Sequence, residues 1–403
     1  MRVIFVFAFL RVVNMSSFVH SLVVGAGAVG LSVSRLLVRS GREVLLVDSA
    51  GRAGTGTSAR NSGVVHAGIY YERGSLKAST CVEGSWMLHR FADLHKVPIN
   101  KCGKLIVAVN KSEDAKLQIL YTRALGLGAR DLVLLSGSDA RRFEPSLSQS
   151  VVGAIWSPHT ATIDAPSFID ALLAECSVDP LFTFSAKSCV EKVEYNATDG
   201  LFTVQFSDET RIRCRELVNA AGLRATDLAR SIVPQSSVPK VEFYKGSYFT
   251  LPKLSQPFQR LIYPTSMGGH LGIHLDASSD RIRLGPDSVK LDGIGTFTHN
   301  SEGLFDVDPL AATQFRSAVH QYWEEVPAAS EFVPDFAGIR PKSVTGDFVV
   351  EQHGMSGYVG LYGIDSPGLT ASLSLAHRVG EMLGIGGVVM PEMKSTHIYE
   401  WEA

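Results

Sequence analysis

The chain has 403 residues, of which 45% are hydrophobic and 19% are charged, so it is globular and long enough for two substantial hydrophobic cores. Its formal net charge of -2 leaves no basic excess, which argues against a nucleic-acid partner, and no block of like charges indicates a disordered tail. The five cysteines are scattered without a CxxC pair. This pattern indicates reduced thiols in a reducing compartment and argues against a metal site.

The N-terminal segment is unusual. Residues 3–10 are continuously apolar between Arg2 and Arg11, and no acidic residue precedes Glu43. This run is far shorter than the roughly 20 residues that cross a bilayer. Three interpretations stay open: a mitochondrial import leader, an extension upstream of a true start at Met15, and a secretion signal or membrane anchor.

Residues 21–48 follow the order strand, glycine turn, helix, strand and acidic residue. The apolar run 22–24 leads into the turn, a helical run covers 31–40, and a second apolar run at 44–47 is closed by Asp48. This order is typical of a βαβ unit that binds a dinucleotide. The alternative is a glycine-rich turn in an ordinary α/β protein.

The residues of this unit are expected to have separate roles. Gly25 permits the tight turn, and Gly27 lets a pyrophosphate approach the backbone because it has no Cβ. Gly30 lets the helix pack closely on the strand. The helix N-terminus offers free N–H groups and a positive dipole end to the phosphates. Asp48 lies 18 residues after Gly30, where a carboxylate accepts the ribose hydroxyls.

A loop rich in Gly, Thr and Ser follows at residues 49–63 and leads into the run VVHAGIYY, which ends at Tyr71. Its many backbone donors and small side chains suit the wrapping of a cofactor. The alternative is a mobile surface loop.

Further along, the pattern predicts more helices and strands. We expect helices at 76–94, from about 110 to 125, at 166–176, at 304–323 and at 369–383. We expect strands at 103–109, 132–135, 153–156 and 217–221, two antiparallel strands within 183–206, a meander at 243–251, 260–263, 271–275 and 281–284, and strands at 348–351 and 358–361.

The nucleotide-fold pieces lie at the start, middle and end of the chain, and the meander lies between them. The sequence therefore predicts an α/β protein in which a Rossmann-type cofactor domain is interleaved with an α+β substrate domain built on an antiparallel sheet. The predicted limits are a leader at 1–20, the cofactor domain at 21–100, 150–235 and 335–390, the substrate domain at 101–149 and 236–334, and a C-terminal tail at 391–403.

The glycine turns favour FAD over NAD. One dinucleotide fingerprint follows a strand, whereas the glycines at 126–128 and 384–387 do not lie at a strand-to-helix junction. Turns at Gly222 and at 363–368 each follow an apolar strand and precede a helix, which fits a long, bent cofactor that touches the fold three times. The last helix would direct its positive dipole end at the pyrimidine edge of an isoalloxazine.

Six segments together resemble a known family. They are TSARNSGVVHAGIYY at 57–71, VNAAG at 218–222, IYP at 262–264, LGP at 284–286, GIRP at 338–341 and GIDSPGLT at 363–370. The chain resembles the FAD-dependent D-amino-acid oxidase-type superfamily from about residue 21 to 383, and within it the L-2-hydroxyglutarate dehydrogenases (also called oxidases). The first and last segments are specific for that branch. The family more often has Glu where this chain has Asp365.

The resemblance implies an activity, partners and a location. It implies oxidation of the dicarboxylate L-2-hydroxyglutarate to 2-oxoglutarate, with hydride transfer from C2 to flavin N5 and electron transfer to a quinone, an electron-transfer protein or oxygen. Peripheral membrane association stays open. We expect a mitochondrial location, with the cytoplasm as the alternative.

Other functions stay open at this point. An enzyme of the same fold could act on an amino acid, a secondary amine or glycerol 3-phosphate. A flavoprotein without turnover and an NAD-linked dehydrogenase are further alternatives.

Four residues are candidates for the chemistry. His66 is the expected base for the hydroxyl proton, because imidazole titrates near neutral pH. Its alternatives are a structural role or a covalent flavin link. Arg340 is expected to bind the substrate carboxylate with its planar guanidinium, the alternative being a structural arginine. His274 and Tyr263 are expected to form the floor of the substrate cavity, with structural roles equally open.

Further residues are expected to support substrate and cofactor. Lys245, Tyr248 or Arg60 could bind a second carboxylate. Asp365 is expected to cap the final turn rather than to act as an acid or base. The residues expected to bind FAD are Gly25, Gly27, Ala28, Val29, Gly30, Asp48, Thr57, Ser58, Asn61, Ser62, Gly63, Val190, Ala221, Gly222, Gly338, Gly363, Asp365, Gly368, Leu369 and Thr370.

Overall fold

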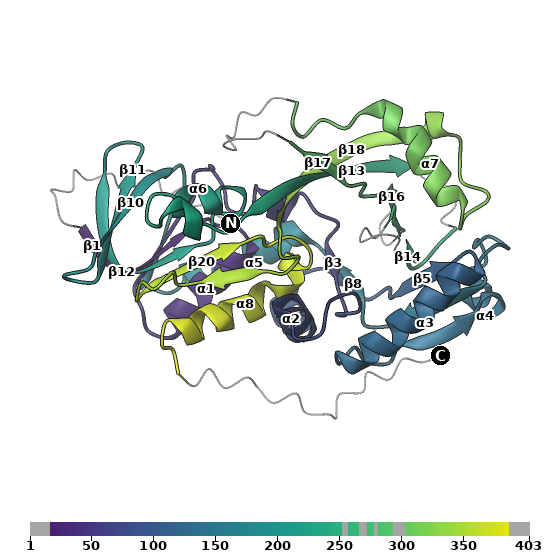
Figure 1. Cartoon of the computed structure of the whole chain (residues 1–403), viewed down its shortest axis with the longest axis horizontal. Helices are drawn as coiled ribbons and strands as arrows, with labels where there is room; N and C mark the ends of the chain where they lie inside the picture. The colour runs from purple at the N-terminus through teal and green to yellow at the C-terminus, as the bar shows by residue number, and fades with distance from the viewer. Residues whose placement is uncertain (1–16, 252–256, 266–271, 278–280, 293–302, 387–403) are drawn as a thin grey trace.

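The computed structural model describes residues 17–251, 257–265, 272–277, 281–292 and 303–386. Within these ranges the strands form one eight-stranded, one nine-stranded and one three-stranded sheet. The two large sheets occupy opposite ends of the molecule (Figure 1). Most of the predicted leader and the whole predicted tail lie outside the described residues.

The helices and strands have the following bounds. The helices are α1 (Ala28–Arg39), α2 (Leu76–His95), α3 (Lys111–Gly126), α4 (Gly137–Phe143), α5 (Ala165–Ser177), α6 (Ala225–Ala229), α7 (Ala312–His320) and α8 (Gly368–Met382). The eight-stranded sheet holds β1 (Ser17–Val24), β2 (Val44–Val47), β9 (Phe182–Ser185), β10 (Val190–Asn196), β11 (Leu201–Phe206), β12 (Arg211–Asn219), β19 (Val349–Glu351) and β20 (Tyr358–Tyr362). The nine-stranded sheet holds β5 (Lys104–Ala108), β6 (Val133–Ser136), β7 (Gly153–Ser157), β13 (Val241–Leu251), β14 (Leu261–Pro264), β15 (Leu275–Asp276), β16 (Ile282–Leu284), β17 (Val289–Leu291) and β18 (Val333–Ser343). The small sheet holds β3 (Val64–Val65), β4 (Ile99–Asn100) and β8 (Ala161–Ile163).

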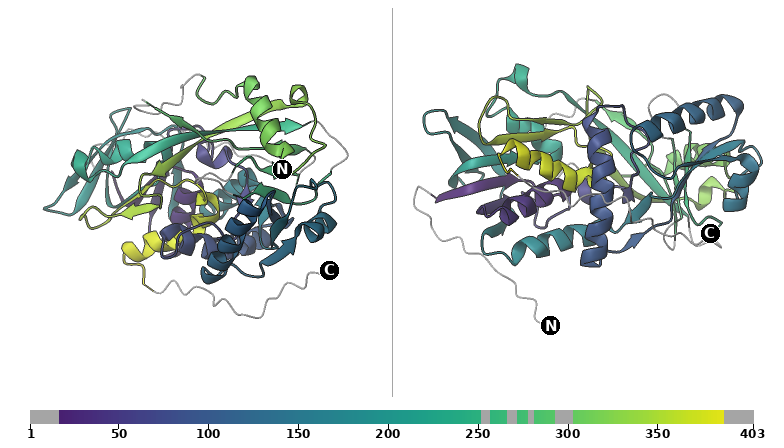
Figure 2. Two further views of the ribbon diagram at one scale, coloured as in Figure 1. Left: turned by 45° about the vertical axis from the view of Figure 1, so that its right-hand side comes forward. Right: turned by 90° about the horizontal axis from the view of Figure 1, so that it is seen from below.

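The first large sheet has a parallel centre. Strand β1 pairs in parallel with both β2 and β12, so that Val23 lies between Leu46 and Val218, and β12 also pairs in parallel with β20. The strands are buried at the paired residues 22–24, 44, 46–47, 217–219 and 358–360, which fits the mainly apolar residues there. Helices α1 and α8 contact each other, and α2 lies against α8 (Figure 2). The predicted strand–turn–helix–strand unit is thus confirmed.

The segment 183–206 differs from its prediction as two antiparallel strands. Strands β10 and β11 do form an antiparallel hairpin around residues 196–200. Strand β9 is separate, however, and pairs in parallel with β2. The apolar residues of both parts look alike in sequence, and only the turn at residues 186–189 separates them.

The second large sheet contains the predicted meander. Its longest pairing is the antiparallel one between β13 and β18, although β14 pairs in parallel with β5. Helices α3 and α4 pack on β5, β6 and β7 at one end of this sheet (Figure 1). The predicted mixed α/β fold class, with a Rossmann-type domain and a substrate domain, is confirmed. The exact domain limits stay a prediction. Strand β7 at 153–157 falls within the predicted cofactor domain but pairs with β5 of the second sheet.

Two elements are shorter than predicted. Helix α7 begins at Ala312, not near residue 304, because Pro309 and the Asp308 side chain, which accepts from Leu310 N, start a preceding 3₁₀ turn. Strand β15 covers only Leu275–Asp276, and residue 271 of the predicted strand lies outside the described residues.

Candidate active site

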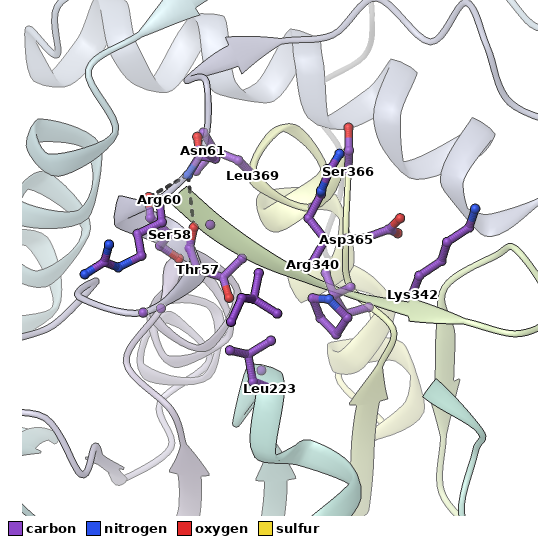
Figure 3. A pocket seen from close by; sticks show the side chains of 18 of the residues that line it. Thr57, Ser58, Arg60, Asn61, Leu223, Arg340, Lys342, Asp365, Ser366 and Leu369 are labelled. Atoms are coloured by element: carbon purple, nitrogen blue, oxygen red, sulfur yellow. Dashed lines mark hydrogen bonds between the residues drawn. The ribbon is translucent and has the colours of Figure 1, made fainter. Parts of the chain in front are cut away.

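A cavity of about 1380 Å³ is lined by residues from both large sheets. One part is formed by the turn after β1, by the loop 54–62 and by the N-terminus of α8. The other part is formed by strands β13, β14 and β18 of the second sheet. Figure 3 shows Thr57, Ser58 and Asn61 on one side of this pocket and Arg340, Asp365 and Ser366 on the other.

The glycine turn after β1 leaves no space for side chains at two positions. Gly25 has φ +103°, and a Cβ there would lie 2.3 Å from the carbonyl oxygen of Ala220. A Cβ on Gly30 would lie 1.8 Å from the carbonyl oxygen of Gly25. Gly27 is less restricted, with its Cβ position 3.0 Å from Ser58 Oγ. The turn therefore depends on glycine at its first and last positions.

Asp48 ties the turn to the end of β2. Its Oδ2 accepts a hydrogen bond from Ala26 N at 2.7 Å, and its Oδ1 accepts from Ala50 N at 2.8 Å. Since a carboxylate oxygen has two lone pairs, both oxygens keep acceptor capacity toward the cavity that Asp48 lines. This arrangement is compatible with the predicted contact to ribose hydroxyls.

The loop 57–63 is held by one side chain. Asn61 Nδ2 donates to the carbonyl oxygens of Thr57 and Ser58, at 3.2 and 2.7 Å, and Asn61 Oδ1 accepts from Gly63 N at 2.8 Å (Figure 3). Ser58 Oγ accepts from Ala28 N at 3.0 Å, at the start of α1. The side chain of Asn61 is thus engaged within the loop, which leaves the backbone of the loop to meet a ligand.

His66 lies buried where the small sheet meets α8. The backbone N–H of His66 donates to Thr370 Oγ1 at 3.1 Å, and the ring atom Nε2 lies 3.3 Å from Ser366 Oγ. Its Nδ1 is buried and has no hydrogen-bond partner among the described residues. Burial, and then the charge of Lys104, lower the pKa of His66 to about 3. The imidazole is therefore neutral at physiological pH.

Arg340 lies in the middle of β18 and lines the same cavity. Its Nη2 donates to the carbonyl oxygen of Asp287 at 2.6 Å. The facing strand β13 leaves space for the guanidinium because residue 246 is glycine. A Cβ at this position would lie only 2.6 Å from Arg340 Nη2. The guanidinium is thus oriented by the protein and keeps further N–H donors for a ligand.

The aromatic rings of Tyr263 and His274 are stacked. Their centroids lie 3.5 Å apart and their planes differ by 13°. Both residues are buried and line the cavity. Tyr263 belongs to β14, and His274 directly precedes β15 rather than lying within a strand as predicted.

Asp365 does not cap the final helix, so this prediction was wrong. The N-cap of α8 is Pro367, which makes no side-chain cap hydrogen bond. The Asp365 carboxylate, which is half-buried, instead forms an ion pair with the buried Lys77, with Oδ1 and Nζ 2.6 Å apart. Burial raises the pKa of Asp365, and Lys77 opposes this effect. No local sequence pattern indicates this pair, because 288 positions separate its partners.

The structure brings most of the predicted residues to the cavity. The four candidates for chemistry line it, as do Tyr248 and Arg60 and the predicted FAD-binding residues apart from two. Gly63 and Gly363 are the two that do not line it, since they form turns against Ile163 and Ser343. Lys245 does not line it either, because its Nζ donates to the carbonyl oxygen of Asp306.

The donor set fits a dinucleotide with a flavin. Glycines remove side chains where a phosphate would approach, and the first turn of α8 adds a helix N-terminus without a side-chain cap. The cavity continues from Asp48 past these turns to His66 and Arg340, which suits an elongated cofactor.

The sequence matches the family described as DAO, FAD dependent oxidoreductase, over residues 20–382. The chain belongs to this family. It is 34% identical over 404 residues to L-2-hydroxyglutarate dehydrogenase, mitochondrial, of Arabidopsis thaliana, a match that covers 90% of this chain and 82% of that protein. FAD is the cofactor of this FAD-dependent oxidoreductase, as predicted, and the predicted resemblance to the family is confirmed.

Two solved structures show the same fold. L-alpha-glycerophosphate oxidase from Mycoplasma pneumoniae with FAD bound has a TM-score of 0.81 at 22% identity, and the match covers 91% of this chain and 95% of that chain. Glycine oxidase from Geobacillus kaustophilus has a TM-score of 0.76 at 16% identity, with 92% and 95% covered. Among the described residues of this FAD-dependent oxidoreductase, no helix is both long and apolar enough to span a bilayer.

Proposed function

We propose that this enzyme oxidises L-2-hydroxyglutarate to 2-oxoglutarate. The observation that carries the proposal is that His66 and Arg340 line one cavity together with the glycine turn. The similarity to the L-2-hydroxyglutarate dehydrogenase of Arabidopsis thaliana supports the choice of substrate. When bound, FAD would supply the group that accepts the hydride from C2 of the substrate.

Arg340 binds the carboxylate next to the reacting carbon. Its bond to the carbonyl oxygen of Asp287 fixes the guanidinium before the substrate arrives. A guanidinium held in this way can make two parallel hydrogen bonds to a carboxylate and so orient C2. The second carboxylate lies toward the buried Tyr248, or toward Arg60, whose guanidinium is 4.3 Å from the ring centroid of Phe305.

His66 accepts the proton of the substrate hydroxyl. Burial and the charge of Lys104 lower the pKa of His66 to about 3, so the ring enters the reaction unprotonated. Two carboxylates bound nearby would favour the protonated ring by charge attraction and would raise the pKa of His66 in the complex. The contact between His66 Nε2 and Ser366 Oγ fixes the direction of the ring.

The electrons then leave to a second acceptor, which we infer to be a quinone, an electron-transfer protein or oxygen. We infer a mitochondrial location, which the name of the Arabidopsis thaliana relative supports.

The experiment is an absorption spectrum of the purified FAD-loaded enzyme under anaerobic conditions. Each enantiomer of 2-hydroxyglutarate, glycine, sarcosine and glycerol 3-phosphate are added separately. We expect the flavin absorption to be bleached by L-2-hydroxyglutarate and not by the D enantiomer. Bleaching by an amine or by glycerol 3-phosphate alone would instead assign the site to that substrate.

A further inference from the structure

Lys104 is a buried cation close to the cavity. It is the first residue of β5 and is 1% exposed. Among the described residues, no carboxylate lies within ion-pair distance of its Nζ. The atom lies instead 4.8 Å from the ring centroid of Tyr70 and 4.7 Å from that of Tyr263. The faces of these rings stabilise the ammonium group only in part.

This position is unfavourable for a charge. An unpaired ammonium group in a protein interior loses its hydration without an ionic partner. Burial accordingly lowers the pKa of Lys104 to about 7. The following residues of β5 are Leu105, Ile106 and Val107, so an apolar side chain would suit the strand equally well. A strongly perturbed lysine beside a cavity is typical of functional sites.

The groups around Lys104 include two of the candidate residues of the active site, Tyr263 and His66. Tyr70 and Tyr263, whose rings it contacts, both line the cavity. The Tyr263 ring stacks on His274, and the charge of Lys104 acts on His66. The remaining neighbour is Cys81 of α2, and burial raises the pKa of its thiol to about 12. Burial also raises the pKa of Tyr70 and Tyr263 and lowers that of His66, so these three groups and Cys81 are neutral when Lys104 is charged.

We propose that Lys104 is a positioning residue that holds a positive charge against the rings of Tyr70 and Tyr263, which line the cavity, and that this charge strengthens the binding of an anionic substrate. The inference rests on the proposed function for the identity of the substrate as a dicarboxylate. It predicts that substrate affinity changes as Lys104 loses its proton. A role in packing alone would produce no such change with pH.

The test measures the binding of glutarate, a dicarboxylate without the reacting hydroxyl, to the FAD-loaded enzyme at pH 6 and pH 9.5. The variants are Lys104→Met, which removes the charge, and Lys104→Arg, which keeps it at both pH values. Lys111→Met, at the exposed start of α3, is the control.

We expect the Lys104→Met variant to bind glutarate about tenfold more weakly than the wild type at pH 6 and with the same affinity as the wild type at pH 9.5. At both pH values the glutarate affinity of Lys104→Arg should stay close to that of the wild type at pH 6. The affinity of Lys111→Met should equal that of the wild type at each pH. An equal effect of Lys104→Met at both pH values, or no effect, would overturn the proposal.

A second measurement separates the alternatives. The thermal unfolding of each variant is compared, with Lys104→Gln as an additional neutral variant. If both neutral variants fail to fold while Lys104→Arg folds, the charge is structural and the proposal is wrong. A wild type that binds glutarate but is not reduced by L-2-hydroxyglutarate would contradict the proposed function and not the role of Lys104.

Discussion

His66 Nε2 and Ser366 Oγ lie 3.3 Å apart, although 300 positions separate the two residues in the chain. The Thr370 hydroxyl links the same two segments, since its Oγ1 accepts from the backbone N–H of His66 and donates to the carbonyl oxygen of Val64. The segment after β3 is thus attached to the N-terminus of α8. A ring held in this way has one direction toward the cavity, which is a requirement for a base.

Replacing His66 should remove the base without removing the cofactor. We expect His66→Gln to lower the rate of flavin reduction by L-2-hydroxyglutarate by about 10²- to 10⁴-fold, because general-base catalysis contributes that much. Anaerobic stopped-flow absorption measures this rate. The FAD content should stay at the wild-type level.

The matched variant Ser366→Ala keeps the imidazole and removes only its contact with Oγ. We expect a smaller loss, about tenfold or less, since one neutral hydrogen bond contributes about 1 kcal/mol. Equal rates for His66→Gln and the wild type would show that another group accepts the proton.

Replacing Arg340 should mainly weaken substrate binding. Arg340→Met removes the guanidinium from the cavity, and we expect kcat/KM to fall by about 10²- to 10³-fold, with a large part of the loss in KM. Arg340→Lys should recover only part of it, because an ammonium group cannot make the paired hydrogen bonds. Steady-state kinetics measure both.

The control for charge is Arg283→Met on the same sheet. The guanidinium of Arg283 is paired with Asp335 at 2.9 Å, outside the cavity. This variant should keep the wild-type KM. A similar rise of KM in both variants would indicate a general effect of net charge and contradict the assignment of Arg340.

The glycine turn should not tolerate a methyl group. A Cβ on Gly30 would lie 1.8 Å from a backbone oxygen, so Gly30→Ala must shift the turn away from α1. We expect loss of bound FAD and a lower melting temperature. Gly126→Ala at the end of α3, where nothing lies within 4 Å of the added Cβ, should retain both. Full FAD occupancy in Gly30→Ala would contradict the packing described for the turn.

The stability of the protein should depend on Lys104 and pH. The folded-state pKa of about 7 lies below the ordinary 10.5, so burial of the charge destabilises the fold fully below pH 7, and this effect disappears as the pH rises toward 10.5. Lys104→Met should therefore raise the free energy of unfolding by at most about 5 kcal/mol at pH 6. The gain should shrink by pH 10, which thermal and denaturant unfolding can measure. A variant less stable than the wild type at pH 6 would contradict this description.

The sequence predicted local units more reliably than contacts between them. The strand–turn–helix–strand unit ending at Asp48 follows from spacing alone, because the glycines and the apolar periods are local. The ion pair between Lys77 and Asp365 depends on the packing of α2 against the turn before α8, and no local pattern encodes it. Asp365 therefore looked like a helix cap.

Lys104 illustrates the same limit. A lysine at the start of a strand is normally exposed, and the burial of this one results from the tyrosines of two distant segments. Asn61 was predicted to contact the cofactor through its side chain or its backbone, and that contact stays a prediction; what the sequence did not show is that its side-chain amide bonds within its own loop. In both cases the amino-acid type was visible in the sequence and its surroundings were not.

The most direct test of the central claim is a single anaerobic turnover of the FAD-loaded enzyme with L-2-hydroxyglutarate, with and without deuterium at C2. We predict one 2-oxoglutarate per flavin reduced, slower bleaching with the deuterated substrate, and no reaction with the D enantiomer. An unbleached flavin, or bleaching without formation of 2-oxoglutarate, would contradict the account.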